Sequence, residues 1–383
     1  MYRALLSALV LHLVAATPAH PRRHAPLHFA PPSPSLRASI VVPARDEAAQ
    51  LPALLGALAA QVDEHGQPFQ RGTLEVLVLL NNCTDDSHGA VCRAARRYPH
   101  LRVLVASEDF EPHRAHVGTA RALLMDAAAE RFRQRGRSRG IILSTDADSR
   151  PLPDWVAANW REVRRGADAV GGRVCIDPSE RAGLPREVRR WLLVDIGYRR
   201  ALERVRDLYA PDPHDPFPRH HQHYGASFAI TAEAYGRCGG MAPLRSSEDV
   251  GLYHALVRCG ARVRHSYRPK VYTSARLRGR AQNGMADALA EWAALRAEPQ
   301  VEPAADAVAR LQALGRARWE RPHCPPDLAM LETPAPLPGR SQPIRAALRA
   351  LRAHAEALAA LSLAERLDLP TSAPSLLPTP SAA

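Results

Sequence analysis

The sequence predicts an α/β fold in which a mostly parallel sheet is covered by helices on both faces. From Ala38 onward, short apolar runs alternate with segments whose apolar residues recur at helical spacing. The runs are hydrophobic at nearly every position, which is typical of parallel strands that are buried on both faces. A chain of 383 residues is also long enough to bury the core of one large domain and to carry extensions.

The predicted elements follow one another in the order typical of this class. Leu51, Leu54 and Leu58 lie at helical spacing in the first helix, and we expect Pro43 to end the first strand. The expected strands are Ala38–Val42, Leu74–Leu80, Leu101–Val105, Gly140–Ser144, Ala169–Cys175, Gly225–Thr231, Arg262–Tyr267 and Val271–Ser274. The expected helices are Ala48–Gln61, a stretch ending at Tyr98, Gly118–Arg133, a stretch between Asp154 and Arg165, Glu187–Leu208 and Asp249–Cys259.

Composition divides the chain into three expected segments. Residues 1–36 form a leader and a Pro-rich linker, and residues 37–298 form the main domain. Residues 299–383 form an extension that is rich in Ala, Arg and Pro. Within this extension we expect one or two helices over Ile344–Leu367 and a disordered tail.

The chain is basic, with 51 Lys and Arg against 39 Asp and Glu and a formal net charge of +12. Such a balance attracts nucleic acid, anionic lipid or phosphorylated substrates. No basic stripe interleaved with aromatic residues accompanies it, so we expect a solvated, Arg-rich surface and no nucleic-acid partner.

The N-terminus and the cysteines bear on the cellular location of the protein. The six cysteines form no CxxC pair, which fits a reducing compartment better than a disulfide framework. The apolar run Ala4–Ala16 is too short to span a bilayer. It resembles a signal-peptide core interrupted by His12, and an amphipathic helix on a membrane or a nonstructural leader are the other interpretations. We expect a cytoplasmic protein, with peripheral contact at the inner membrane face left open.

Polar loops follow three of the predicted strands, where sheets of this class bind their ligands. They are Pro43–Glu47, Asn81–Asp86 and Thr145–Arg150. In the third loop, Asp146 and Asp148 project from the same side if the backbone stays extended. Two such oxygen ligands suit Mg2+ or Mn2+ completed by substrate phosphates. The alternative interpretation is a solvated Asp-rich turn.

A second acidic pair, Glu248 and Asp249, opens a predicted helix. An acid at a helix N-terminus is favoured by the dipole and by free amides, so a simple cap is one interpretation. A buried carboxylate ahead of a helix can also take a proton from a hydroxyl as a general base. We choose Asp249 as the candidate base, with Glu248 supporting it.

Taken together, the order and spacing of these motifs resemble those of family 2 inverting glycosyltransferases. The matching stretches are Ser39–Glu47 for the opening strand and donor loop, Leu79–Asp86 for the second-strand motif, Asp146–Asp148 for the metal motif, and Glu248–Asp249, just after Gly239–Gly240, for the acceptor-site acid motif. The resemblance covers about Leu36 to Arg280. It implies a GT-A type, Rossmann-like fold. It also implies metal-dependent, inverting transfer of a sugar from a UDP- or GDP-linked donor to a hydroxyl acceptor.

The resemblance further implies a role for each matching residue. The residues that would line the nucleoside pocket are Pro43, Ala44, Arg45 and Glu47. Asp146 would face the ribose, and Asp148 would bind Mg2+ or Mn2+ bridging the diphosphate. Asp249, supported by Glu248, would activate the acceptor for one in-line displacement, which inverts the anomeric centre.

Several positions depart from the family pattern. Asn81 stands where the family usually has an aspartate that accepts a hydrogen bond from uracil, and its amide can accept or donate. Arg121, soon after Gly118, is the candidate phosphate contact. The Gln-x-x-Arg-Trp motif of the processive synthases is absent, so we do not expect processive export.

Further cationic candidates lie late in the main domain. His220, His221 and His223 are candidate ligands of a metal or diphosphate, or else are solvated or bonded to backbone. The stretch Ser274–Arg280 either lends arginines to the leaving diphosphate or forms a basic strand end.

Two other functions compete with sugar transfer. The first is a degenerate glycosyltransferase-like module that binds nucleotide without catalysis. The second is a sugar-phosphate nucleotidyltransferase, which usually needs a Gly-rich loop with a lysine after the first strand, and this chain has neither there. The donor sugar, the acceptor and the oligomeric state are not specified, because variable loops build acceptor pockets.

Overall fold

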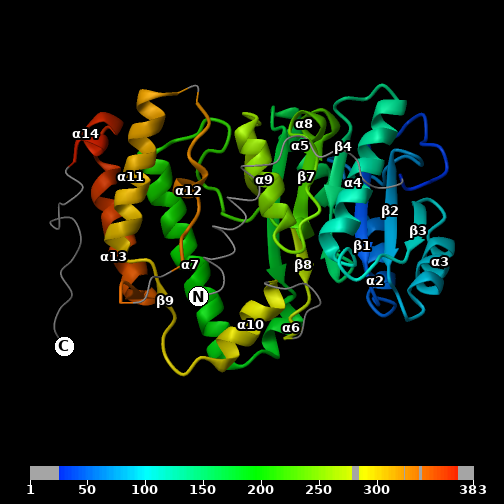
Figure 1. Cartoon of the computed structure of the whole chain (residues 1–383), viewed down its shortest axis with the longest axis horizontal. Helices are drawn as coiled ribbons and strands as arrows, with labels where there is room; N and C mark the ends of the chain where they lie inside the picture. The colour runs from blue at the N-terminus through cyan, green and yellow to red at the C-terminus, as the bar shows by residue number, and fades with distance from the viewer. Residues whose placement is uncertain (1–25, 278–283, 323, 336–338, 370–383) are drawn as a thin grey trace.

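The computed structural model describes residues 26–277, 284–322, 324–335 and 339–369. The strands of its main sheet are β1 Ala38–Ala44, β2 Leu74–Asn81, β3 Arg102–Glu108, β4 Ile141–Ser144, β5 Ser149–Pro151, β6 Ala169–Ile176, β7 Phe228–Thr231 and β8 Val263–Thr273. They form an 8-stranded sheet in the order β3-β2-β1-β4-β7-β6-β8-β5, flanked by helices (Figure 1).

The first half of this sheet is parallel. β1 pairs with β2 on one side and with β4 on the other, and β2 pairs with β3. Every residue of β1 and β2 is buried, which explains why both runs are apolar at most positions. Because these strands run the same way, the polar loops at their carboxyl ends emerge at one edge of the sheet.

Pro43 does not end the first strand, and this expectation was wrong. The backbone oxygen of Val41 accepts a hydrogen bond from Thr145 N, so residue 43 faces the same neighbour by strand alternation. β4 has already ended at Ser144. The missing N–H of Pro43 therefore leaves no ladder bond unmade, and β1 continues to Ala44.

The second half of the sheet is mixed. β7 runs antiparallel to both β4 and β6, β5 runs antiparallel to β8, and β6 and β8 are parallel. The two strands expected over Arg262–Tyr267 and Val271–Ser274 form the single strand β8. A register shift between Gly171 and Arg173 of β6 lets it pair along both stretches.

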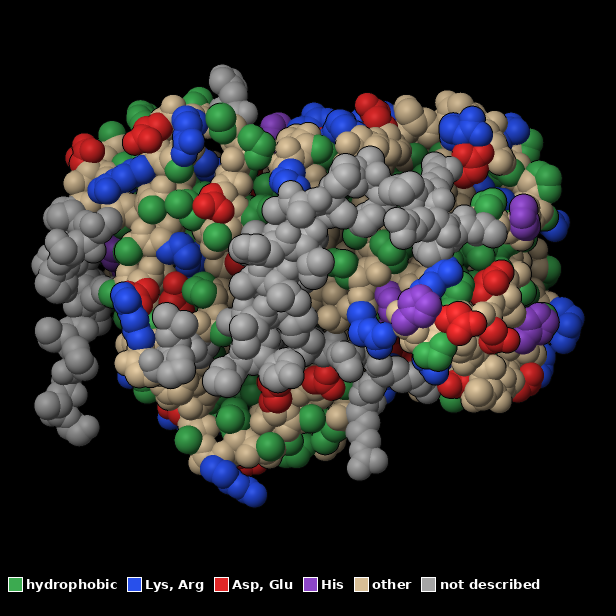
Figure 2. Space-filling model, in the orientation of Figure 1, with side chains coloured by type: hydrophobic (Ala, Val, Ile, Leu, Met, Phe, Trp, Pro, Cys, Tyr) green, Lys and Arg blue, Asp and Glu red, His purple; other side chains and the backbone are tan. Residues whose placement is uncertain are grey.

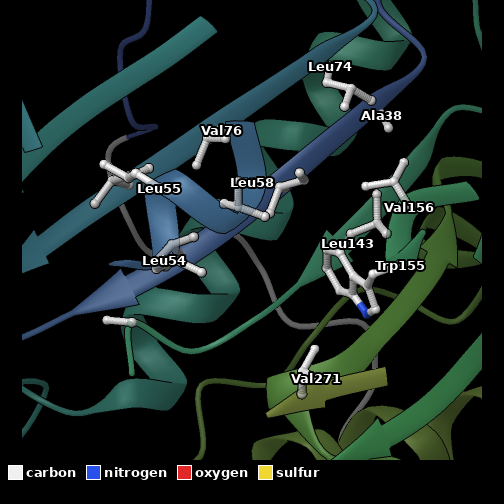
Figure 3. Close-up of a cluster of buried hydrophobic side chains, with 14 of the residues drawn as sticks. Ala38, Leu54, Leu55, Leu58, Leu74, Val76, Leu143, Trp155, Val156 and Val271 are labelled. Carbon is white, nitrogen blue, oxygen red and sulfur yellow. The ribbon is translucent and has the colours of Figure 1, made fainter. Parts of the chain in front are cut away.

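Helices cover both faces of the sheet, which confirms the predicted α/β class and its GT-A type arrangement. They are α2 Leu51–Ala59, α3 Ser87–Arg97, α4 Val117–Gln134, α5 Trp155–Arg164, α8 Ala232–Arg237 and α9 Glu248–Arg258. Alternate residues of β1 join different cores: Ile40 lies with Leu54 of α2 and Trp155 of α5, and Val41 lies with Leu124 of α4. Figure 3 shows the first of these cores.

A second group of helices stands beyond α7, Arg186–Tyr209 (Figure 1). The remaining elements are α6 Pro178–Ala182, α10 Met285–Ala294, β9 Gln300–Val301, α11 Ala304–Glu320, α12 Leu328–Leu331, β10 Gln342–Pro343, α13 Ile344–Ala359 and α14 Leu363–Asp368. A separate hydrophobic core contains Val205 of α7, Leu311 of α11 and Leu351 of α13. The extension is therefore helical, as expected, and its helices pack on α7.

Some expectations fall outside the described residues. The apolar run Ala4–Ala16 and the expected disordered tail after Leu369 are among them. Within the described part of the chain, no helix is long and apolar enough to cross a membrane. All six cysteines are unpaired. On the face shown in Figure 2, described Lys and Arg side chains are scattered among Asp and Glu.

Candidate functional site

A cleft of about 1450 Å³ opens at the carboxyl ends of the parallel strands. Small-molecule pockets typically measure about 300–1,000 Å³, so this cleft has room for more than one ligand. The residues that the sequence nominated for the nucleoside, the metal and catalysis all line it: Pro43, Ala44, Arg45, Glu47, Asn81, Arg121, Asp146, Asp148, Glu248 and Asp249. The fold thus brings together residues from five separate stretches of the chain.

The loops after β1 and β2 are fastened to each other. Asp46 Oδ1 accepts hydrogen bonds from Thr84 N at 2.6 Å and from Asp85 N at 3.3 Å. Glu47 N donates to Ser87 Oγ at 2.9 Å. These bonds hold the first polar loop in place at the edge of the sheet.

Backbone strain gathers at this edge. The described non-glycine residues with a positive φ are Asp46 at 50°, Asn82 at 51° and Ser247 at 58°. Asp46 and Ser247 line the cleft, and Asn82 follows Asn81, which lines it too. Such conformations cost about 1–3 kcal/mol each and cluster at functional sites, where surrounding contacts enforce them.

One cluster outside the nominated residues has the composition of a metal site. Ligand atoms of Asp46, Cys83 and Asp85 lie within 4.8 Å of one another. These carboxylates already accept backbone hydrogen bonds, Asp46 from Thr84 N and Asp85 from Ala48 N. The loop contacts account for the cluster, and we assign no metal to it.

Asn81 presents an unpaired acceptor to the cleft. It ends β2 and is 3% exposed. Its Oδ1 atom is buried and has no hydrogen-bond partner among the described residues. An unpaired buried acceptor costs about 1–3 kcal/mol, so a ligand N–H that reached it would relieve that cost.

Asp146 and Asp148 lie in a turn, so the condition of an extended backbone is not met. The backbone oxygen of Asp146 accepts a hydrogen bond from Ser149 N at 3.0 Å. The turn forms because the chain must reverse from β4 into β5, a strand that the sequence did not reveal. Both carboxylates nevertheless line the cleft, so the turn brings them together instead of strand alternation.

Arg121 joins the two acidic motifs from inside the protein. Its Nη2 donates to Asp146 Oδ1 at 2.7 Å, and its Nε donates to Glu248 Oε1 at 3.0 Å. Nη1 donates to Ser144 Oγ and to the backbone oxygen of Gly225. Burial alone would lower the pKa of Arg121, but the charges of Asp146 and Glu248 raise it. The residue that we nominated as a phosphate contact is thus engaged with protein oxygens.

Arg276, which follows β8, lies between Asp148 and Glu47. Its Nη2 is 2.9 Å from Asp148 Oδ2, and its Nη1 donates to Glu47 Oε1 at 3.1 Å. Burial raises the pKa of Asp148 to about 6, the charge of Asp146 adds to this rise, and Arg276 opposes it. The sequence marked the basic stretch Ser274–Arg280 but did not single out this residue.

The second acidic pair begins α9 and faces the cleft. Asp249 Oδ2 accepts a hydrogen bond from Gly225 N, and its Oδ1 accepts one from Val250 N, each at 2.8 Å. Burial raises the pKa of Asp249. Burial and the charge of Asp249 together raise the pKa of Glu248 to about 7. The N-cap position belongs to Ser247, so neither acid is a simple N-cap.

Two glycines allow the close packing that places this pair. A Cβ atom on Gly118 of α4 would lie 1.8 Å from the backbone oxygen of Leu244, in the loop that leads to α9. A Cβ atom on Gly225 would lie 2.7 Å from the guanidinium carbon of Arg121. Larger side chains at either position would displace the loop or the arginine.

The Asp146–Asp148 pair has the chemistry of a site for Mg2+ or Mn2+. Arg121 and Arg276 each occupy one oxygen of one carboxylate. The other oxygen of each accepts no hydrogen bond from another described residue. Hard divalent cations prefer such oxygens, bind through one or two carboxylates and complete their shell with water and phosphates. The residues present therefore fit this ion.

The histidines divide into two kinds of environment. His220 Nδ1 accepts a hydrogen bond from Gln222 N, so its Nε2 carries the proton and donates to the backbone oxygen of Ser266. His221 and His223 line the cleft. The ring of His223 stacks on that of Tyr253, with the ring centroids 4.1 Å apart. Burial lowers the pKa of all three well below the usual value, which keeps them neutral.

One wall of the cleft escaped the sequence analysis. Along α7, Trp191, Asp195, Tyr198, Arg199 and Arg206 face the cleft at spacings of one helical face. That spacing is visible in the sequence. In the sequence alone, this pattern resembles a charged helix face exposed to solvent. Only the packing of the C-terminal helices against the other side of α7 shows that this face lines a cleft.

No family model matches the chain, and no curated protein matches its sequence. Among solved structures it is similar to a mannosyltransferase, PcManGT from Pyrobaculum calidifontis in complex with GDP-Man and Mn2+. That structure is 18% identical, the match covers 95% of this chain and 79% of that one, and the TM-score is 0.43.

Two other similar structures are glycosyltransferases of bacteria. S. aureus TarS 1-349 in complex with UDP is 14% identical, with 77% of this chain and 68% of that chain covered and a TM-score of 0.43. M. tuberculosis glucosyl-3-phosphoglycerate synthase is 18% identical, with 67% and 79% covered and a TM-score of 0.38. At these identities and TM-scores, we take the activity of this chain from its own residues.

Proposed function

We propose that the chain transfers a sugar, with inversion, from a nucleoside-diphosphate sugar to a hydroxyl acceptor, as family 2 glycosyltransferases do. One observation carries the proposal. The carboxylates Asp146 and Asp148 lie in the same cleft as Asp249, a helix-N-terminal carboxylate whose pKa is raised. Metal-ligand chemistry for a diphosphate and a general base for an acceptor are thus available together.

The donor would bind over the loops after β1 and β2. The unpaired Oδ1 of Asn81 is matched by the ring N–H that both uracil and guanine carry, which supports UDP- or GDP-linked donors alike. The loop residues Pro43, Ala44, Arg45 and Glu47 would surround the nucleoside, and Asp146 would face the ribose. Arg121 would act as a positioning residue, because its donors hold Asp146 and Glu248.

The leaving diphosphate would be stabilised near the Asp146–Asp148 turn. A Mg2+ or Mn2+ ion held there by Asp148 and Asp146 would supply Lewis acidity that stabilises the negative charge of the departing group. Arg276 adds a cation in the same place, and a guanidinium binds phosphate oxygens in a bidentate manner.

Asp249 would act as the general base. Its Oδ2 atom is held by Gly225 N, which fixes the carboxylate at the cleft surface. The base takes the proton of the acceptor hydroxyl while that oxygen attacks the anomeric carbon and the bond to the diphosphate breaks. A single displacement of this kind inverts the anomeric centre, in contrast to two-step retention through a covalent intermediate.

Substitution of the two acids tests the proposal. We expect Asp249→Asn to lower kcat by about 10²–10⁴-fold, the range for losing a general base. Asp148→Asn should remove activity that depends on Mn2+. A panel of UDP- and GDP-hexoses with Mn2+ and mixed hydroxyl acceptors, read by nucleoside-diphosphate release and by product mass, provides the measurement. Asp109→Asn, an exposed acid, is the matched control.

Fold integrity must be checked in the same variants. All of them should keep the far-UV circular dichroism and thermal midpoint of the unsubstituted chain within a few degrees. Full transfer activity in either acid variant would overturn the assignment. Binding of nucleoside diphosphate without any hydrolysis or transfer of the donor would instead indicate a non-catalytic binding module.

A further inference from the structure

The side of the cleft that α7 forms is not used by the proposed donor site. In Figure 1, α7 stands on the side of β8 and α9 that faces away from β1 and β2. Its residues Asp195, Tyr198 and Arg199 line the cleft together with Arg173 of β6. We call these four residues and His221 the α7 wall.

β6 has an open edge at this wall because β7 pairs only with Ala169–Gly171. The side chain of Gln222 closes that edge. Its Oε1 accepts a hydrogen bond from Val174 N at 2.9 Å, and its Nε2 donates to Val174 O at 3.2 Å. This pairing fixes the neighbouring residues Arg173 and His221 at the cleft surface.

Two arginines of the wall retain unused hydrogen-bond donors. Arg173 has no carboxylate partner among the described residues, and its guanidinium carbon lies 5.4 Å from the ring centroid of Tyr267. Arg199 donates only through Nε, to both oxygens of Asp195 at 3.1 and 3.0 Å. Its two terminal nitrogens donate to no described residue. Arg206 differs, because its Nη2 pairs with Glu203 at 2.9 Å.

Both guanidinium groups are close to one histidine of the wall, His221. Burial lowers the pKa of His221, and the charges of Arg199 and Arg173 lower it further, so both cations act on this one side chain. The ring of His221 lies 6.2 Å from that of Tyr224. The residue after Tyr224 donates its backbone N–H to Asp249.

A further donor without a partner belongs to the same wall. Tyr198 is 2% exposed, and its hydroxyl has no hydrogen-bond partner among the described residues. The acids nearby are largely neutralised, because Asp195 is held by Arg199 and Glu203 by Arg219. Glu291 and Arg181, which also line the cleft, are both exposed.

We propose that the α7 wall binds an anionic group, a phosphate or a carboxylate, carried by the hydroxyl acceptor. The terminal nitrogens of Arg199 and the guanidinium of Arg173 provide the cations, and Tyr198 provides a neutral donor. Arginine suits this role because its planar fork binds such anions in a bidentate manner. The inference rests on the proposed function, since it takes Asp249 as the base that receives the acceptor.

The test compares acceptors that differ only in charge. Glucose, glucose 6-phosphate and glucuronic acid are offered to the full chain with Mn2+ and the donor sugar that it hydrolyses fastest. We expect kcat/KM to be at least tenfold higher for one of the anionic acceptors than for glucose. In Arg199→Gln and Arg173→Gln, that preference should fall by about ten- to a hundredfold, as expected for losing a charge-assisted hydrogen bond.

Controls separate this inference from the proposed function. Arg200→Gln removes the same charge from an exposed position of α7 and should leave the preference unchanged. Donor hydrolysis without acceptor, and UDP or GDP binding by calorimetry, should be unchanged in Arg199→Gln and Arg173→Gln. Equal use of charged and neutral acceptors, with donor hydrolysis intact, overturns the anion site alone. Absence of nucleotide binding and of donor hydrolysis in the unsubstituted chain overturns the proposed function instead.

Discussion

Glu248 and Asp249 are adjacent along the chain, yet their carboxylates have different partners. Glu248 is buried and bound to Arg121, whereas Asp249 is held by two backbone N–H groups at the surface of the cleft. Proximity forces the two acids to titrate together, because each disfavours the ionised form of the other. The environment of each carboxylate, and not its residue type, separates the candidate base from its supporting acid.

The dependence of transfer activity on pH should reflect the titration of Glu248 and Asp249. A base must be ionised, so activity is present above the pKa of the pair and is lost as the pH falls through it. Burial raises the pKa of Asp249, so the acid limb should lie at a higher pH than an exposed aspartate would give. Glu248→Gln removes the like charge and should move the limb of the kcat/KM profile to lower pH. An unmoved limb would contradict the coupling.

The segment between α7 and β7 has little regular structure, and a buried ionic network holds it. Asp215 accepts hydrogen bonds from His265 Nδ1 at 2.8 Å and from Arg264 Nη1 at 2.9 Å. Arg219, 1% exposed, donates from Nε to Glu203 Oε2 of α7 at 2.9 Å. Charged residues that resemble a solvated loop in the sequence thus form the base of the α7 wall.

Loss of one member of this network should destabilise the fold. We expect Asp215→Asn to lower the free energy of unfolding at pH 7 by about 3–5 kcal/mol, because Arg264 then has no carboxylate partner among the described residues. Urea unfolding followed by circular dichroism measures this. Asp109→Asn, an exposed acid, is the control and should change it by less than about 0.5 kcal/mol.

The difference between Asp215→Asn and the unsubstituted chain should depend on pH. Burial alone would raise the pKa of Asp215, but the charge and hydrogen bond of His265 and the charges of Arg219 and Arg206 lower it. A carboxyl whose pKa is lowered by folding contributes stability above its unfolded pKa, about 3.9, and loses that contribution as the pH falls through the folded pKa. The difference in stability between the two proteins should therefore be constant above about pH 4 and narrow as the pH falls below it, and a difference that does not narrow would contradict this origin.

At the scale of the whole molecule, α7 belongs to both halves of the structure. One face lines the cleft, and the other contributes to a hydrophobic core with α11, α13 and α14. The loop before α13 also reaches α9, where His254 Nε2 lies 2.7 Å from Glu332 Oε1. We therefore propose that the extension, set apart as 299–383 by its composition, folds together with the main domain.

Truncation tests this dependence. A chain that ends at residue 298 should aggregate or lose its cooperative unfolding transition, because apolar residues such as Val205 and Leu202 would face water. A chain that ends at Leu369 keeps every described contact and should unfold as the full chain does. Size-exclusion chromatography and thermal unfolding distinguish the two. A monomeric, cooperatively folded chain of residues 26–298 would show that the main domain is independent.

The sequence by itself determined the fold class and the chemical inventory of the site. Period and burial pattern are local properties, so the apolar runs of β1 and β2 identified parallel strands, and the polar loops after them identified the edge of the sheet where the cleft opens. The end of the strand at Pro43 was misjudged, and the sequence left open whether the backbone at Asp146–Asp148 is extended or forms a turn. Their conformations depend on where β4 ends and on which strand β5 pairs with, and neither fact is local.

Only the tertiary structure decided which residues meet. Arg121 reaches Glu248 across 127 positions of the chain, and Arg276 reaches Glu47 across 229. Such contacts depend on the path of the backbone through the sheet, and no side-chain periodicity encodes that path. The α7 wall was missed for the same reason. A charged helix face becomes the side of a cleft only when the extension packs against the other face of that helix. Residue types set the available chemistry, and the packing of distant segments set its geometry.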